Sequence, residues 1–174
     1  MHQTSFCRYM FVEDVYGVDF HRILLEKLFS QNLLNGCRPA IYRFPSKKCN
    51  QSLSRKVRAR LLDCSNWKIV FVLDSEYRDR DIASRDIIDH FNKEELKNMR
   101  LVVIHPMHEA WLCIGLGGKR NACRNNPIEE IMKITNRYYT KPELSRLVNR
   151  VNIRLLLSEQ DFIEYIEVVK WLMA

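Results

Sequence analysis

Apolar and polar positions along the chain follow a pattern typical of alternating strands and helices. Short runs rich in β-branched and aromatic residues occupy positions 5–13, 38–44, 67–74 and 100–105, and each predicts a strand. The third run, "WKIVFVLD", is almost continuously apolar, which is typical of a strand buried on both faces. Between the runs, apolar residues recur at helical spacing, most clearly over positions 18–34, 51–64 and 82–91. The pattern predicts an α/β fold with an open sheet of about four mostly parallel strands flanked by helices.

The character of the chain changes after residue 106. Positions 108–116 predict a short helix, and the Gly, Asn and basic residues of 117–127 predict a loop. Residues 127–174 are helical wherever they are periodic, with one apolar stripe in the last segment formed by Phe162, Ile166, Val169 and Leu172. We expect these helices to cap the sheet.

Length and composition are those of one globular domain. The chain has 174 residues, of which 47% are hydrophobic, enough to build a sizeable core. We predict a single domain over 1–174, with a core at about 1–112 and a helical C-terminal extension at about 127–174. The longest apolar stretches, such as 69–73, are far shorter than the roughly 20 residues of a membrane helix. With no secretory signal visible, we expect a cytoplasmic protein without a membrane partner.

Six cysteines are spread through the chain without a C-x2-C or C-x4-C pair: Cys7, Cys37, Cys49, Cys64, Cys113 and Cys123. This spacing argues against a zinc knuckle, and an intracellular location argues against a disulfide framework. We expect reduced, mostly structural cysteines.

The net charge of +7 is unevenly distributed. Between Arg43 and Arg60 lie seven Lys or Arg residues and no acidic ones. One interpretation is a track for a nucleic-acid backbone, and the other is a solvated helix face. The candidate phosphate contacts are Lys47, Lys48, Arg55, Lys56 and Arg58.

Acidic residues follow three of the predicted strands. Glu13 follows the first, Asp74 and Glu76 follow the third, and Glu109 comes shortly after the fourth. In open α/β sheets ligands bind at the carboxyl ends of the strands, and gathered carboxylates favour a divalent cation such as Mg or Mn. The alternative is helix capping, for which Asp79 and Asp81 are the candidates.

Other motifs near the fourth strand are weaker. "HPMHE" at 105–109 is not H-E-x-x-H, and "GLGGKR" at 115–120 lacks P-loop spacing. His105 or His108 could bind a phosphate or shuttle a proton, but a structural or surface role is favoured for them, and helix termination explains the glycines. Lys119, Arg120 and Arg124 could still contact phosphate.

Three segments together resemble a Toprim domain, the α/β metal-binding module of topoisomerases, primases and several nucleases. They are "FVEDVYGVDFHRILLEKLF", "IVFVLDSEYRDRD" and "VVIHPMHEAWLCIGL". The order of a Glu after the first strand and a D-x-D-like pair after the third is similar. E-A-W-L and the later "NNPIEEI" resemble small Toprim-like proteins related to the overcoming-lysogenisation-defect nucleases.

The resemblance implies roles for four residues. Glu13 matches the Toprim Glu, which acts in acid/base chemistry or at the metal, and Asp74 matches the first Asp of the acidic pair. Glu76 stands in place of the second Asp, a departure that changes the reach of the carboxylate. Glu109 matches the Glu of E-A-W-L and is a further candidate metal ligand. For Trp111 and Leu112 we expect core packing.

The leading hypothesis is therefore a nuclease that uses Mg or Mn for phosphodiester chemistry on DNA or RNA. Asp74, Glu76 and Glu109 are its candidate metal ligands, and Glu13 is its candidate catalytic residue. The alternative is a non-catalytic module that binds nucleic acid or a protein partner. A phosphate-transferring enzyme for small nucleotides is disfavoured because no nucleotide-binding glycine motif is present.

Overall fold

The computed structural model describes residues 5–13, 15–44 and 51–174 of the chain. The strands are β1 Phe6–Val12, β2 Ala40–Arg43, β3 Asn66–Asp74 and β4 Met99–Ile104. The helices of the first two thirds are α1 Val15–Ser30, α2 Ser52–Leu61, α3 Arg80–Ile88, α4 Lys93–Lys97 and α5 His108–Gly115. Those that follow are α6 Arg120–Asn125, α7 Pro127–Thr135, α8 Glu143–Leu147, the 3-10 helix η1 Val148–Arg150, α9 Ile153–Leu156 and α10 Gln160–Met173. Over these ranges, no helix combines the length and apolar character needed to cross a bilayer.

The four strands form one open sheet in the order β2-β1-β3-β4, and every neighbouring pair is parallel. The predicted fold class is therefore confirmed. From β1 the chain moves outward to β2 on one side, whereas β3 and β4 extend the sheet on the other side. The direction of winding thus reverses between β1 and β3, which places the topological switch point of the sheet there.

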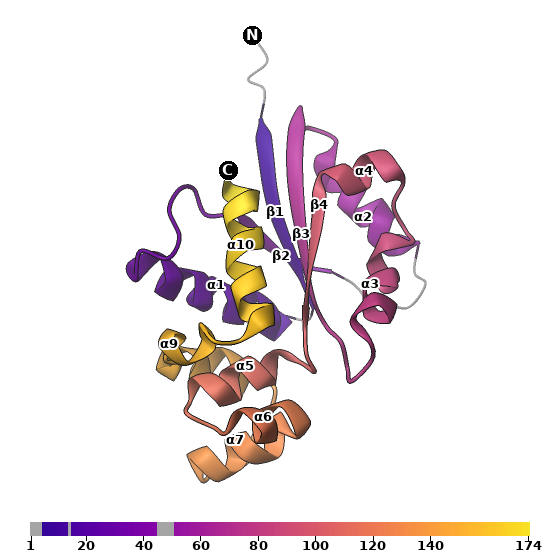
Figure 1. The fold of residues 1–174 in the computed structure, drawn as a ribbon. Coiled ribbons are helices and arrows are strands. Elements are labelled where there is room, and N and C mark those ends of the chain that lie inside the picture. Colours follow the sequence, from indigo (N-terminus) through magenta and orange to yellow (C-terminus); the bar gives the residue numbers. More distant parts are fainter. Residues whose placement is uncertain (1–4, 14, 45–50) are drawn as a thin grey trace.

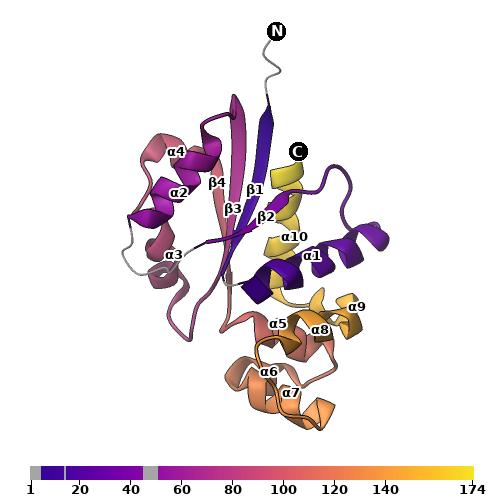
Figure 2. The same cartoon turned by 180° about the vertical axis from the view of Figure 1, so that it is seen from behind.

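Helices cover both faces of the sheet. In Figures 1 and 2, α1 and α10 lie on one face, and α2, α3 and α4 lie on the other. Successive residues of a strand point to opposite faces, so Val70 and Val72 join the core beneath α1 and α10, while Ile69 and Phe71 join the core beneath α2 and α3. Burial on both faces is the physical reason for the almost continuous apolar run of β3.

The helical extension gathers at one end of the sheet before α10 returns across it. Helices α5, α6 and α7 lie beyond the carboxyl end of β4 (Figure 1). Trp111 and Leu112 of α5 are fully buried, which confirms their role in core packing. The apolar stripe of α10 is also buried, so the last helix caps the sheet as predicted.

Two expectations about the segment after α5 and about the cysteines are wrong. Residues 120–125, predicted as a loop, form α6, although Gly117 ends α5 with a φ of 96° as expected. Disulfides join Cys7 to Cys64 and Cys113 to Cys123. The first pair is 57 residues apart in sequence but only 5.8 Å apart between Cα atoms, because the parallel pairing of β1 with β3 brings the two chain segments together. The spacing of the cysteines along the sequence does not indicate that Cys7 and Cys64 lie close together.

Replacing Gly115 with Ala tests how the helical extension packs on α5. A methyl group at Gly115 would overlap the side chain of Val151, and overpacking of a core costs about 1–3 kcal/mol. We expect Gly115→Ala to lower the free energy of unfolding in urea by about that amount. Val151→Ala in the same chain makes room for the methyl group, so the double variant should lose less than the sum of the two single losses. Simple additivity would contradict the contact.

Candidate functional site

Glu13 and Asp74 meet at the switch point of the sheet. Glu13 directly follows β1, and Asp74 is the last residue of the neighbouring strand β3. The backbone N–H of Asp74 donates a hydrogen bond of 2.7 Å to Glu13 Oε1. Ligands of open α/β sheets bind outside the carboxyl ends of the strands at this point of the topology. Two residues predicted from the sequence are thus in direct contact at the expected place.

Asp74 is also held by the first residue of α5. Asp74 Oδ1 accepts hydrogen bonds from the backbone N–H of His108 at 2.9 Å and from its ring Nδ1 at 2.6 Å. Only 3% of the His108 side chain and 11% of the Asp74 side chain are exposed. A charge-assisted bond in such a water-poor place is strong and directional. It fixes the carboxylate of Asp74 at the strand end.

A chain of buried hydrogen bonds continues from His108 into the core. Nε2 of His108 lies 2.7 Å from Nε2 of His21, a residue of α1. Nδ1 of His21 lies 2.9 Å from the hydroxyl of Tyr165, a residue of α10. The hydroxyl of Tyr165 donates to the sulfur of Met10 in β1. The chain therefore links the acidic strand end to the two helices that cover one face of the sheet.

The pKa values of the two histidines in this hydrogen-bond chain are shifted in opposite directions. Burial by itself lowers the pKa of His108, but the negative charge of Asp74 and the hydrogen bond to it outweigh burial, so the pKa lies above its ordinary value. The pKa of His21 lies well below its ordinary value, first because the ring is buried and second because His108 is positive. The two directions fit an arrangement in which protonated His108 donates to Asp74 and to neutral His21, and His21 donates to Tyr165. In this assignment every ring N–H has an acceptor.

Glu76 does not continue the strand. β3 ends at Asp74, and Glu76 is an exposed turn residue with a φ of 53°. Asp74 and Glu76 would face the same side of the sheet only if the strand continued to residue 76, and it does not. Glu76 nevertheless stays near the site, because its charge and that of Glu13 both contribute to the raised pKa of Arg78, although the hydrogen bond from Arg78 to Asp86 is the main cause.

Glu109 lies in a different contact from the one predicted. Its side chain is fully buried, and Oε1 accepts hydrogen bonds from the hydroxyl of Tyr139 at 3.0 Å and from Lys141 Nζ at 2.9 Å. The neighbouring His108, and not Glu109, binds Asp74. On a helix, successive residues point in different directions, so only one of this pair can face the strand end. This geometry disfavours Glu109 as a metal ligand.

The donors at the strand ends suit a hard cation with few protein ligands. Among the residues that the structure describes, no three or more His, Cys, Asp or Glu side chains are arranged to hold a metal ion. Magnesium often takes only one or two carboxylates and completes its shell with water and substrate phosphates. Asp74, with Glu13 at the adjacent strand end and Glu76 in the following turn, supplies a carboxylate of this type. A closed zinc site is not formed by the described residues.

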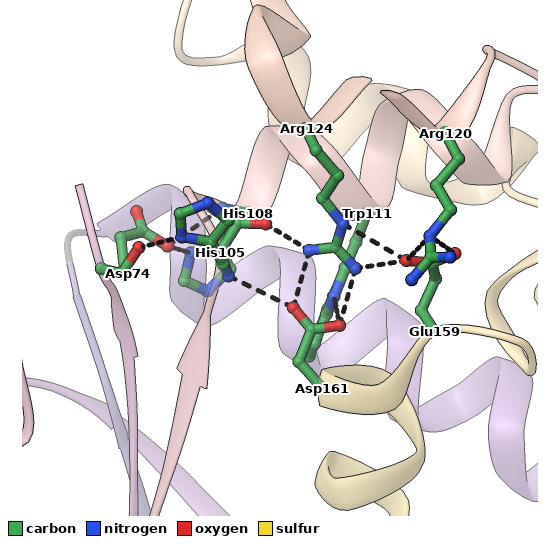
Figure 3. A network of polar contacts seen from close by, with 9 residues as sticks. Asp74, His105, His108, Trp111, Arg120, Arg124, Glu159 and Asp161 are labelled. Atoms are coloured by element: carbon green, nitrogen blue, oxygen red, sulfur yellow. Dashed lines mark hydrogen bonds and ion pairs between the residues drawn. The ribbon is translucent and has the colours of Figure 1, made fainter. Parts of the chain in front are cut away.

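A second polar network lies on the other side of the segment that follows β4 (Figure 3). Arg124 of α6 binds both oxygens of Asp161 at 2.7 and 2.8 Å and also binds Glu159 at 2.6 Å. Asp161 further accepts hydrogen bonds from the indole of Trp111 and the backbone of His105. The side chains of Arg124, Glu159 and Asp161 are 17%, 1% and 12% exposed. This network joins α5, α6 and α10 to the end of β4.

The predicted basic track is only partly free for a ligand. Lys47 and Lys48 lie outside the described residues. Arg58 forms a two-point ion pair with Glu95, at 2.7 and 3.0 Å, which raises the pKa of Arg58 through the hydrogen bond and the charge of the carboxylate. Arg55 and Lys56 are exposed on α2. The surface candidates that remain on this helix are therefore Arg55 and Lys56.

Sequence reasoning missed most of the residues that support Asp74. His108 was interpreted as structural, and that is correct for its burial, but its contact with Asp74 is part of the site. Sequence reasoning does not identify His21 or Tyr165. The signal for His21 is a polar residue on the apolar face of the first helix, because a buried histidine needs a hydrogen-bond partner. Asp79 caps α3 by accepting from the N–H of Asp81, which confirms the capping prediction for Asp79.

Comparisons with protein-family models, with curated proteins and with solved structures found no match. The residues and their geometry are therefore the observations from which function is inferred.

Replacing Asp161 with Asn tests the second network through its pH dependence. Burial alone raises the pKa of Asp161, but Arg124 outweighs it, and the pKa lies below its ordinary value. A lowered pKa stabilises the fold above the unfolded-state value near 3.9 and loses this contribution as the pH falls. We expect Asp161→Asn to cost about 1.5–3 kcal/mol of unfolding free energy at pH 7, and the difference from wild type to shrink below about pH 4. A difference that stays constant down to pH 2.5 would contradict this. Urea titrations at several pH values measure it.

Proposed function

We propose that this chain is a Toprim-like protein that cleaves phosphodiester bonds of nucleic acid with Mg or Mn, as a nuclease. The observation that carries the proposal is the hydrogen bond between Glu13 and the Asp74 backbone at the switch point of a parallel sheet. These two residues are also among the four to which the Toprim resemblance gives a role. Their acidity inside a chain of net charge +7 supports a metal at the site and a polyanion as the substrate.

In the proposed site, Asp74 and Glu76 would hold the metal ion. When bound, such an ion polarises a phosphate and makes water more acidic. Glu13 would act as a general acid or base on the attacking water or the leaving oxygen. Glu109 is not included among the ligands, because its buried carboxylate binds Tyr139 and Lys141.

His108 acts in this proposal as a positioning residue. Two of its N–H groups bind one oxygen of Asp74, so the carboxylate cannot rotate freely. A carboxylate held in a fixed orientation is what a weakly coordinated hard cation needs from its few protein ligands.

The nucleic acid would be held by basic residues, with Arg55 and Lys56 of α2 as contacts to the backbone. A cytoplasmic location is a further part of the proposal that rests on the sequence. The Cys7–Cys64 and Cys113–Cys123 disulfides argue against a cytoplasmic location, because cytosolic thiols are normally kept reduced.

The second candidate is a module with this fold that binds nucleic acid or a protein partner without cutting. Two observations favour it. Glu76 stands where the Toprim pattern has its second Asp, and it lies in a turn beyond the strand. The described residues also form no metal-holding group of three or more side chains.

A cleavage assay separates the two candidates. Labelled single- and double-stranded DNA and RNA are incubated with Mg, Mn or a chelator, and wild type is compared with Asp74→Asn and Glu13→Gln. We expect cutting that depends on the metal and falls by at least about 100-fold in both variants, because removing a positioned acid/base or charged group typically costs that much. Circular dichroism and thermal unfolding confirm that each variant is folded.

Glu94→Gln is the matched control, since Glu94 is an acidic residue on α4 with an 80% exposed side chain. It should cut like wild type. If no substrate is cut with either metal, while salt-sensitive binding remains the same in wild type and both site variants, the nuclease proposal is refuted and the binding module is the better account.

A further inference from the structure

A pocket of about 380 Å³ lies beside the acidic strand end and is lined in part by the loop that follows β3. This volume is at the lower end of those found for ligand sites. Its wall includes four arginines, one histidine and one carboxylate. These are Arg78, Arg80, Arg120, Arg124, His105 and Asp161, and Ser75 and Gln160 are further polar lining residues. Arginine-rich pockets of this size suit phosphate oxygens, which guanidinium groups bind through paired N–H donors.

Carboxylates behind the pocket hold three of the arginines by part of each guanidinium group. Arg78 Nη2 binds Asp86, and its Nε binds the carbonyl of Ser75. Arg120 binds Glu159 through Nε, and Arg80 binds Glu164 through Nη2. Each guanidinium has five N–H donors.

Several donors therefore remain for a ligand. Within the described part of the chain, no further hydrogen bond occupies the Nη groups of Arg120, whose side chain is 65% exposed. The same holds for Nε and Nη1 of Arg80, which is 53% exposed. Arg124 is different, because all three of its nitrogens bind Asp161, Glu159 or a carbonyl. Ion pairs that fix an arginine while leaving part of its fork open pre-organise it for an anion.

The pocket adjoins the proposed catalytic site through consecutive residues. Ser75 directly follows Asp74, and its backbone N–H extends the pairing with β4 by binding the carbonyl of Ile104. The Ser75 hydroxyl lies 2.8 Å from Nδ1 of His105, which lines the same pocket. A ligand in the pocket would thus lie one residue away from the acidic end of β3.

Tyr77 adds a flat surface beside the pocket. The residue is 54% exposed, and its ring lies edge-on to the ring of His105, with centroids 6.1 Å apart. The hydroxyl is tied to the carbonyl of Asn125 by a 2.7 Å hydrogen bond. An exposed aromatic ring fixed next to guanidinium donors is the combination with which proteins bind a base and its phosphate in single strands.

We propose that the pocket formed by Arg78, Arg80 and Arg120 binds a backbone phosphate of a single nucleic-acid strand, and that Tyr77 stacks on a base next to it. The identity of the ligand as nucleic acid rests on the proposed function. The phosphate chemistry rests on the pocket itself. The strand would then run from α6 past the loop after β3 to the acidic site, and not only along the basic residues of α2.

Binding of a fluorescein-labelled 12-nucleotide single-stranded DNA, measured by anisotropy in a chelator, tests this without any cleavage. Arg120→Gln is the main variant, because Glu159 keeps its ion pair with Arg124 when Arg120 is removed. We expect Arg120→Gln and Arg80→Gln each to weaken binding about tenfold and to lower the slope of log affinity against log salt by about one. Tyr77→Ala should weaken binding without changing that slope.

Arg146→Gln is the matched control. Arg146 is an exposed arginine on α8 that also forms an ion pair, with Glu143, but it does not line the pocket. Thermal unfolding shows that each variant is folded. If folded Arg120→Gln and Arg80→Gln bind the strand like wild type, or lose no more affinity than Arg146→Gln, the phosphate pocket is refuted. Thymidine monophosphate that binds as tightly as the strand would refute the assignment to a strand.

The two proposals fail separately. Arginine-dependent binding in the chelator together with no cutting in any metal refutes the nuclease and leaves the pocket in place. Metal-dependent cutting that Asp74→Asn abolishes, together with unaltered binding by the arginine variants, refutes the pocket and leaves the nuclease.

Discussion

The contact between Asp74 and His108 is the constraint on which the rest of the site depends. It joins the end of a central strand to the start of α5, and both side chains are largely removed from water. Breaking a buried ion pair by removing one partner costs about 3–5 kcal/mol, because the other charge is left without compensation. The pair forms only when α5 begins at His108, next to the end of β3. It therefore fixes the helical extension to the carboxyl edge of the sheet.

His21 and Tyr165 carry this constraint further into the molecule. They extend the hydrogen-bond chain from the strand end to α1 and α10, helices that are far apart in sequence and lie on the same face of the sheet (Figure 1). A neutral His21 beside a charged His108 satisfies the donors of both rings. Unpaired polar groups in a core would be destabilising, but these hydrogen bonds pair them and align three helices with β1 and β3.

The segment between β4 and α5 is held from both sides. Asp74 binds His108 at one side, and Arg124 with Asp161 binds the backbone of His105 at the other (Figure 3). The acidic strand end and the arginine pocket share this segment as a common wall. The basic residues next to the acidic strand end are therefore not the ones that the distribution of charge along the sequence suggests. The densest basic run lies on and before α2, where Arg58 is already bound to Glu95, whereas the arginines beside the site come from separate segments.

The sequence by itself determined the fold class, because strands buried on both faces and amphipathic helices leave a local record in hydrophobic periodicity. It also selected Glu13 and Asp74, since the chain order of strands and helices already predicts which residues follow a parallel strand. The turn at Glu76, the helix α6 and the partner of Glu109 were decided by the tertiary structure. So were the Cys7–Cys64 pairing, the support of Asp74 by His108 and the grouping of Arg78 with Arg120. Each of these depends on which distant segments pack together, and contacts between distant segments, such as the one between His21 and Tyr165 across 144 residues, leave no periodic signal along the chain.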